Sequence, residues 1–156
     1  MGQKMIRRYG EAVKQGQTYR FRPGVYAILP RGGDLLLTYQ ASPHYEVQLP
    51  GGGIDPGENP IDALHREVFE ETGWKIGDIR KIGAYRRFCY MPEYDKWAEK
   101  LCHIYMARPV HRLGPPSEPD HTPLWMPMAE AARTIASPGD RAFVADLYSR
   151  SRFSTR

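Results

Sequence analysis

The chain has 156 residues, of which 41% are hydrophobic and 26% are charged, and its formal net charge is +4 at pH 7. These fractions are ordinary for a globular protein, and the length suits one domain with a buried core. No apolar run approaches the length of a membrane span, and the N-terminus lacks the apolar region of a signal peptide. We therefore expect a single domain over residues 1–156 that lies in the cytoplasm and has no membrane partner.

Positive charge is gathered at the two ends of the chain. Residues 1–22 hold six of the 22 basic residues and one of the 18 acidic residues. Residues 150–156 contain three arginines and are expected to form a flexible tail. The basic N-terminal segment is consistent with an anionic partner, such as RNA or a phosphorylated substrate, and equally with a solvated surface.

Short apolar runs bounded by turn residues predict strands, and capping residues predict helices. The predicted strands cover residues 25–29, 35–39, 46–49, 79–90, 101–110 and 124–126, and the predicted helices cover residues 60–72, 128–136 and 141–150. A loop over residues 91–99 joins the two longest strands. Several strands with one early helix and two late helices predict an α/β fold with a mixed sheet covered on both sides.

The first predicted helix has the clearest boundaries. Asn59 is a good N-cap, Pro60 suits the first helical position, and Gly73 follows the last turn. The apolar positions expected to face the core are Ile61, Leu64, Val68 and Phe69.

The segment from Gly52 to Trp74 reads GGIDPGENPIDALHREVFEETGW. It matches the pattern G-x5-E-x7-R-E-U-x-E-E-x-G-U, in which U is a bulky apolar residue, at every position. Such a match would arise by chance with a probability on the order of 10⁻⁷ in a chain of this length and average composition. The fixed residues are Gly52, Glu58, Arg66, Glu67, Glu70, Glu71 and Gly73, and the apolar ones are Val68 and Trp74.

Three glutamates of this pattern lie close together on the predicted helix. Glu67 and Glu71 are four residues apart and share a face, and Glu70 lies beside them. Their charges repel one another, and a hard divalent cation such as Mg²⁺, which prefers oxygen ligands, would resolve the conflict. Glu58 could approach the same site from the loop before the helix. The alternative is a solvated helix face in which Arg66 forms an ion pair with a glutamate.

The pattern resembles the Nudix box, the signature of the Nudix hydrolases. The resemblance implies an αβα sandwich with a mixed β-sheet between helices. It also implies hydrolysis of a phosphoanhydride by attack of water at phosphorus, with Mg²⁺ as the cofactor and Mn²⁺ as a substitute for it. By resemblance, the metal ligands are the carboxylates of Glu67, Glu70 and Glu71 and the carbonyl group of Gly51.

The resemblance also gives catalytic roles to Arg66, Glu67 and Glu70. The general base of the family is a box glutamate in some members and an acid from a downstream loop in others. Glu93 is our choice among the loop acids of this chain. The other loop acids are Asp95, Glu99, Glu118 and Asp120.

Substrate choice is expected to depend on residues outside the box. An aromatic and arginine-rich stretch follows it, in which Arg86, Tyr90 and Tyr94 are predicted to bind the phosphate and the base. By resemblance, Pro92 is a marker of ADP-ribose hydrolases and Tyr90 a marker of dinucleoside polyphosphate hydrolases, and the two markers compete.

Two further segments are candidates for the same site. The glycine run lets the backbone pass close to metal and phosphates, so Gly52 and Gly53 are predicted to contact the substrate. His121 and Trp125 are candidates to line a pocket, although such a segment more often forms a strand edge against the last helix.

Three functions remain open. The leading one is a Mg²⁺-dependent pyrophosphohydrolase that cleaves a nucleoside diphosphate linked to another moiety, such as ADP-ribose. The second is a pyrophosphohydrolase of nucleoside triphosphates or of RNA 5′ ends, which the basic N-terminus supports. The third is a catalytically inactive module that binds nucleotides. RNA as a partner and a homodimer also remain open.

Overall fold

The computed structural model describes residues 6–154, with side chains to residue 152. Within that range the chain forms nine strands and three helices. The strands are β1 (Arg7–Gly10), β2 (Arg20–Ile28), β3 (Pro30–Arg31), β4 (Asp34–Gln40), β5 (Glu46–Gln48), β6 (Gly51–Gly53), β7 (Trp74–Met91), β8 (Lys96–Arg112) and β9 (His121–Pro127), and the helices are α1 (Pro60–Thr72), α2 (Met128–Thr134) and α3 (Pro138–Ser154).

The strands form two sheets. The first has the order β1-β7-β8-β2-β6, in which β1 is parallel to β7 and β2 is parallel to β8, while the other two pairs are antiparallel. The second contains β3, β4, β5 and β9, and each of the other three strands pairs with β4. The first sheet is therefore mixed, as the sequence predicts.

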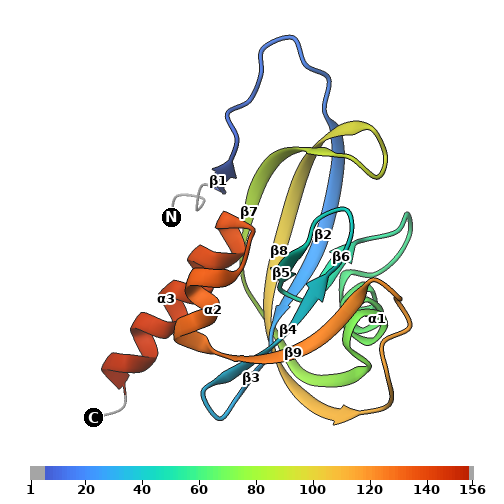
Figure 1. Ribbon diagram of the computed structural model, residues 1–156. Helices are drawn as coiled ribbons and strands as arrows, with labels where there is room; N and C mark the ends of the chain where they lie inside the picture. The colour runs from blue at the N-terminus through green and yellow to red at the C-terminus, as the bar shows by residue number, and fades with distance from the viewer. Residues whose placement is uncertain (1–5, 155–156) are drawn as a thin grey trace.

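Helices cover both sides of the sheets, with α1 on one side and α2 and α3 on the other (Figure 1). Side chains alternate along a strand, so β2 contributes to a buried cluster on each side. The cluster toward α1 contains Val25, Ala27, Ala63, Leu64 and Val68. The cluster toward α2 and α3 contains Ile28, Ile104, Ala131, Ile135 and Val144. This arrangement confirms the predicted αβα fold.

Helix α1 begins and ends where the sequence predicts. The Asn59 side chain accepts a hydrogen bond of 2.8 Å from the backbone N–H of Ile61. Gly73 follows the helix in the left-handed region at φ 78°, and its N–H donates to the carbonyl of Phe69. The helix therefore presents its box residues in a fixed position beside β6.

The predicted core stripe of α1 is only partly correct. Leu64 and Val68 are fully buried, but Ile61 and Phe69 are 37% and 42% exposed. The buried side continues instead through Glu71, which is 6% exposed, because residues 64, 68 and 71 share the face turned toward the sheets. A glutamate thus occupies a core-facing position.

Strands β7 and β8 form the longest pairing in the chain, from Trp74 opposite Arg112 to Met91 opposite Lys96. The predicted loop over residues 91–99 is therefore too long, since only residues 92–95 lie between the two strands. Strand pairing satisfies backbone groups that a longer loop would leave to solvent. Glu99, one of the predicted loop acids, lies within β8.

The sequence does not predict β1, β3 and β6, which are two to four residues long and are defined by their pairing with neighbouring strands. Helix α3 is longer than predicted, so residues 150–154 of the expected flexible tail are helical, and residues 155–156 lie outside the described range. No helix within residues 6–154 is both long enough and apolar enough to cross a membrane.

Candidate active site

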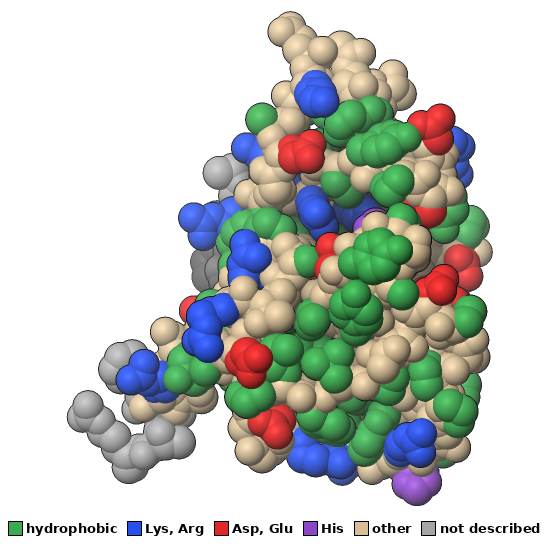
Figure 2. Space-filling view, viewed as in Figure 1, with side chains coloured by type: hydrophobic (Ala, Val, Ile, Leu, Met, Phe, Trp, Pro, Cys, Tyr) green, Lys and Arg blue, Asp and Glu red, His purple; other side chains and the backbone are tan. Residues whose placement is uncertain are grey.

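A pocket of about 390 Å³ lies between β2, β6, α1, β7 and β8 and the start of α3. Its charged and histidine lining comes from Arg22, His44, Glu46, Glu67, Glu71, Arg87, Glu93, Lys100, His121 and Asp140. Figure 2 shows a face that is hollowed near its upper middle, where basic, acidic and histidine side chains meet between hydrophobic ones. A concave, charged site of this size suits a small phosphorylated ligand.

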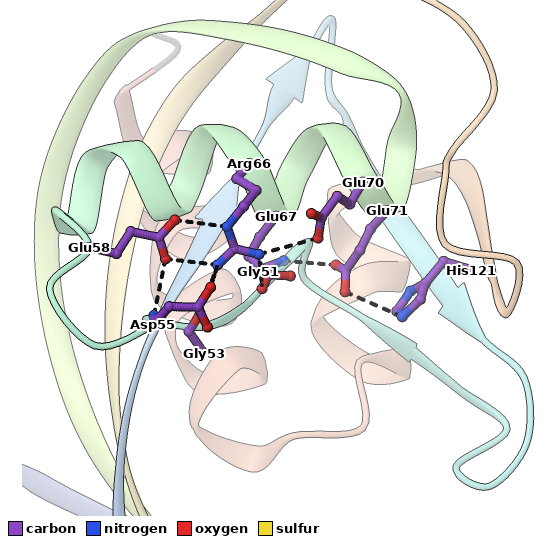
Figure 3. A network of polar contacts seen from close by, with 9 residues as sticks. All are labelled: Gly51, Gly53, Asp55, Glu58, Arg66, Glu67, Glu70, Glu71 and His121. Carbon is purple, nitrogen blue, oxygen red and sulfur yellow. Dashed lines mark hydrogen bonds and ion pairs between the residues drawn. The ribbon is translucent and has the colours of Figure 1, made fainter.

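Arg66 lies at the centre of a network of carboxylates (Figure 3). Its Nη1 lies 3.0 Å from Oε1 of Glu67 and 3.3 Å from Oε2 of Glu70. Its Nη2 also donates to the carbonyl of Gly53 at 3.2 Å. The arginine therefore offsets the repulsion between two box glutamates and ties α1 to β6.

The strongest contacts of Arg66 are with Glu58, at 2.8 Å from Nε to Oε2 and 2.9 Å from Nη2 to Oε1. These hydrogen bonds, together with one from the Asp55 backbone N–H, lower the pKa of Glu58 to about 2. Glu58 was expected to approach the glutamate site itself. Because both of its oxygens are engaged by Arg66, it instead positions the arginine.

Glu71 is buried and is held from two directions. The backbone N–H of Gly51 donates to its Oε1 at 2.9 Å, and Nε2 of His121 lies 3.3 Å from its Oε2. Nδ1 of His121 lies in turn 3.0 Å from the hydroxyl of Thr38. Burial raises the pKa of Glu71 well above its ordinary value, and the negative charge of Glu67 raises it further.

Glu67 depends on the absence of a side chain at Gly52. A Cβ atom at Gly52 would lie 2.5 Å from Oε2 of Glu67, and a Cβ atom at Gly51 would lie 2.1 Å from the carbonyl oxygen of Val25. Burial raises the pKa of the Glu67 carboxyl, which Arg66 partly offsets. The glycine run therefore makes room for the Glu67 carboxylate, and its contact with a metal or phosphates stays a prediction.

These residues fit a hard divalent cation by their chemistry. Glu67 and Glu71 both line the pocket, both are oxygen donors, and each carries a raised pKa that a bound cation would relieve. Glu70 does not line the pocket among the described residues, and its carboxylate contacts Arg66. Within residues 6–154, no group of three or more acidic, histidine or cysteine side chains is already gathered in a metal-binding arrangement.

The downstream acids differ in position. Glu93 lines the pocket, and its Oε2 lies 3.0 Å from Nε2 of His44. Glu118 donates its backbone N–H to the carbonyl of Glu70 at 3.0 Å, and its charge raises the pKa of both Glu67 and Glu71. Glu118 therefore lies within electrostatic reach of the box glutamates, which sequence spacing alone did not indicate.

Two of these acids have other partners. The carboxylate of Asp95 accepts a hydrogen bond from the hydroxyl of Tyr90. Oε1 of Glu99 lies 4.0 Å from Nε of Arg86.

Only some of the residues predicted to bind the substrate line the pocket. Tyr90, Tyr94, Gly52 and Gly53 line it, but Arg86 does not. Arg86 therefore lies outside the pocket, in contrast to the prediction that it binds the substrate there. Tyr85, Arg87 and Cys89 alternate onto the pocket side of β7, so Arg86 points to the opposite face.

The sequence model of the NUDIX domain family matches residues 19–147. The chain belongs to the NUDIX family. This NUDIX chain is similar to a NUDIX hydrolase from Nitrosomonas europaea, with a TM-score of 0.68 and 19% identity over 83% of this chain and 90% of the other. A MutT protein from Bacillus halodurans matches with a TM-score of 0.65 and 19% identity, covering 80% of each chain. At this level of identity the two structures support the fold.

Curated relatives match the NUDIX chain over a shorter stretch. An RNA pyrophosphohydrolase from Legionella pneumophila is 37% identical over 70 residues, and one from Yersinia enterocolitica is 39% identical over 69 residues. These stretches cover 45% and 44% of this chain and 39% of each relative. The chain therefore spans about two fifths of the length of these relatives in the alignments.

Several pocket residues of the NUDIX chain were not predicted. Arg87 lies next to Arg86 in the aromatic and arginine-rich stretch, and only the structure shows that Arg87 is the one that lines the pocket. The sequence places Arg22 only in a basic segment, whereas in the structure its guanidinium lies 5.0 Å from the ring centroid of Tyr94. Asp140, at the start of α3, carries no signal in the sequence. His121, one of the two candidates from its segment, lines the pocket. The other candidate, Trp125, packs edge-on against Trp74 with 5.6 Å between the ring centroids.

Proposed function

We propose that this NUDIX chain is a Mg²⁺-dependent pyrophosphohydrolase of a nucleoside diphosphate linked to another moiety. The observation that carries the proposal is the pairing of Glu67 with the buried Glu71 in one pocket that also contains three cationic side chains. These are Arg22, Arg87 and Lys100. Two carboxylates that repel each other favour a divalent cation, and the cationic side chains favour phosphate oxygens. Membership of the NUDIX family supports the same chemistry.

Glu67 and Glu71 would hold the metal, and the further candidate ligands are Glu70 and the carbonyl of Gly51. Mg²⁺ in this site would neutralise the diphosphate and lower the pKa of an attacking water, with Mn²⁺ as a substitute. Arg66 keeps Glu67 and Glu70 in place through contacts of 3.0 and 3.3 Å. Arg22, Arg87 and Lys100 would bind and orient the phosphates.

The general base accepts a proton from the attacking water. We propose Glu93 for this role because its carboxylate lines the pocket. Glu118 is the alternative, supported by its electrostatic effect on Glu67 and Glu71. Glu93→Gln and Glu118→Gln should be compared by their pH–rate profiles. The base assignment requires that the Glu93 variant loses the acidic limb of the profile and that the Glu118 variant retains it.

The proposed substrate class is tested by a panel of phosphoanhydrides. The panel contains ADP-ribose, nucleoside diphosphate sugars, dinucleoside polyphosphates, nucleoside triphosphates and RNA with a 5′ triphosphate or cap. With Mg²⁺ we expect release of a nucleoside monophosphate from a diphosphate-linked substrate, loss of turnover in EDTA, and incorporation of ¹⁸O from water into a phosphate product. No turnover with Mg²⁺ or Mn²⁺ would favour a nucleotide-binding module without catalysis.

RNA 5′ ends are the second candidate substrate. The curated relatives are named RNA pyrophosphohydrolases. Two residues before β2, Lys14 and Tyr19, contact aromatic side chains of the β7–β8 hairpin. Lys14 Nζ lies 4.2 Å from the ring centroid of Trp97, and Tyr19 contacts Trp97 and Phe88 edge-on. Basic side chains interleaved with aromatic ones are typical of surfaces that bind single strands.

The RNA alternative is best tested by point substitution. Deleting residues 1–22 would remove β1 and the start of β2 and would disturb the fold. Lys14→Ala should weaken the binding of RNA with a 5′ triphosphate. The slope of the logarithm of the binding constant against the logarithm of the salt concentration should decrease in magnitude by about one. The control is Lys75→Ala, because Lys75 is exposed and lies at the start of β7, at the opposite end of the β7–β8 pairing from Trp97. Equal salt slopes for the two variants would count against an RNA path over this segment.

A further inference from the structure

The pocket has two chemically different ends. Glu67, Glu71 and the glycine run lie at one end, and Tyr85, Cys102 and Asp140 lie at the other. Tyr26 lines the same pocket, and burial raises its pKa well above the ordinary value, with the charges of Cys102, Asp140, Glu71 and Glu67 raising it further. Its ring also passes close to the glycines, since a Cβ atom at Gly51 would lie 2.7 Å from it. A ligand whose diphosphate lies at the first end would therefore extend past Tyr26 toward Asp140.

Asp140 is an unusual residue for the floor of a pocket. It is 3% exposed, and the hydroxyl of Tyr85 donates to its Oδ1 at 2.6 Å. Ser137 Oγ lies 2.8 Å from the same Tyr85 hydroxyl. Within residues 6–154 Asp140 forms no ion pair, and Tyr85 is its one hydrogen-bond donor. A buried carboxylate without an ion pair is unfavourable for folding, so a position that served packing alone would suit an uncharged side chain better.

Within residues 6–154 no donor contacts Oδ2 of Asp140, so this oxygen can accept a hydrogen bond from a ligand in the pocket. A carboxylate is an acceptor at both oxygens, and it forms its best contacts with two parallel N–H groups. Among the nucleobases, guanine presents adjacent N–H donors, the ring imino group and the exocyclic amine. Adenine and cytosine present an amine next to a ring acceptor, and uracil presents one imino group between two carbonyls. The lone pairs of adenine, cytosine and uracil would face those of Asp140.

We propose that the Asp140 end of the pocket binds the base of the nucleotide substrate and selects guanine, with Tyr85 positioning the carboxylate. This inference rests on the proposed function, which places the diphosphate beside Glu67 and Glu71. Arg87 and Lys100 line the same pocket and act on Asp140 through their charge without pairing with it. Burial raises the pKa of Asp140 to about 6, so the carboxylate is ionised at pH 7.5 and acts as an acceptor.

The test is equilibrium binding of GMP, IMP, AMP and UMP in EDTA at pH 7.5, measured by calorimetry. IMP has the imino group of GMP and lacks its exocyclic amine, so it isolates one hydrogen bond. We expect GMP to bind about tenfold more tightly than IMP and still more tightly than AMP or UMP, since one hydrogen bond to a charged group is worth about a tenfold change in affinity. AMP or UMP binding within threefold of GMP would overturn the proposal.

Two variants sharpen this test. Asp140→Asn should reduce GMP binding about tenfold and bring GMP and IMP within twofold of each other. Asp146→Asn is the matched control, because Asp146 lies on the exposed side of α3, 3.0 Å from Arg150, and should change nothing. A GMP preference that survives in Asp140→Asn overturns the assignment to this residue. The comparison of bases in the unaltered chain holds even if that variant does not fold.

These measurements are made without turnover, so they separate the two claims. Selective GMP binding without hydrolysis of any guanosine diphosphate derivative would support the base site and contradict the proposed function. Hydrolysis of a nucleoside diphosphate derivative without selective GMP binding would support the proposed function and contradict the base site.

Discussion

Arg66 and Glu58 are joined by two hydrogen bonds of 2.8 and 2.9 Å that connect the loop before α1 to the helix itself. One edge of the guanidinium binds Glu58, and Nη1 contacts Glu67 and Glu70. The conformation of the loop, the position of the arginine and the charge balance of the helix are therefore linked.

Glu58→Gln should lower the melting temperature at pH 7, because the side chain would no longer pair with Arg66 as an anion. The pKa of Glu58 is lowered from 4.5 to about 2 in the folded chain. The stabilisation is therefore present above pH 4.5 and is lost as the pH falls from 4.5 through 2. Melting temperatures of the two proteins should converge over this range. Asp78→Asn, which breaks the exposed pair with Arg108, is the control and should have little effect at any pH.

Gly52→Ala should damage catalysis more than stability. The new Cβ atom would meet the carboxylate of Glu67, which is the mobile end of a side chain and can move away. Displacement of a proposed metal ligand should lower kcat on the order of a hundredfold. The control is Gly114→Ala, since no atom lies within 4 Å of its added Cβ atom. A Gly52 variant with normal kcat would show that Glu67 needs no fixed position.

The sequence predicted the parts of this site that lie on one helix. The spacing of Glu67 and Glu71, the N-cap Asn59 and the end of the helix at Gly73 are local features, and all of them agree with the structure. Arg86 was chosen in place of Arg87 because an aromatic run does not show which residues of a strand face the pocket. Which side chains of β7 face the pocket depends on its pairing with β8, and that pairing contains register shifts near Ile76 and Gly83.

Asp140 lies beyond sequence-based prediction for a different reason. It reaches the pocket only because α3 packs against the sheet far from the box in sequence, and an acidic residue in the first turn of a helix is ordinary. The contacts of His121 with Glu71 depend likewise on the pairing of β9 with β4. Long-range pairing of this kind has no local signal.

Arg87→Ala should raise KM by about tenfold with little change in kcat, if the guanidinium binds a phosphate that is present in both the ground state and the transition state. Arg86→Ala should leave both constants unchanged, because Arg86 lies outside the pocket and its side chain is 52% exposed. Steady-state kinetics on the best substrate of the panel would check both. The reverse ranking would mean that the phosphates bind on the other face of β7.

Asp140→Asn should raise the melting temperature at pH 7.5 and have a smaller effect at pH 4. The pKa of Asp140 is raised from 3.8 to about 6, so the unaltered chain loses stability as the pH rises through this range. The difference corresponds to about 3 kcal/mol at most. The groups that face Asp140 are Tyr85, Arg87, Lys100, Glu46 and Cys102. A melting difference that does not change with pH would mean that Asp140 is not buried as an anion.

The proposed role of Glu71 as a metal ligand in a catalytic site is tested most directly by comparing Glu71→Gln with Glu130→Gln. Both variants remove one negative charge, but Glu130 is exposed on α2 and lies outside the pocket. Mg²⁺-dependent turnover and the melting temperature in EDTA are measured for each. We predict that Glu71→Gln lowers kcat about a hundredfold or more, and that it melts at the same or a higher temperature without metal, because a buried carboxylate with a raised pKa is removed. Glu130→Gln should match the unaltered chain in both respects. Near-normal turnover of Glu71→Gln at all Mg²⁺ concentrations, or inactivity that results from unfolding, would contradict the account.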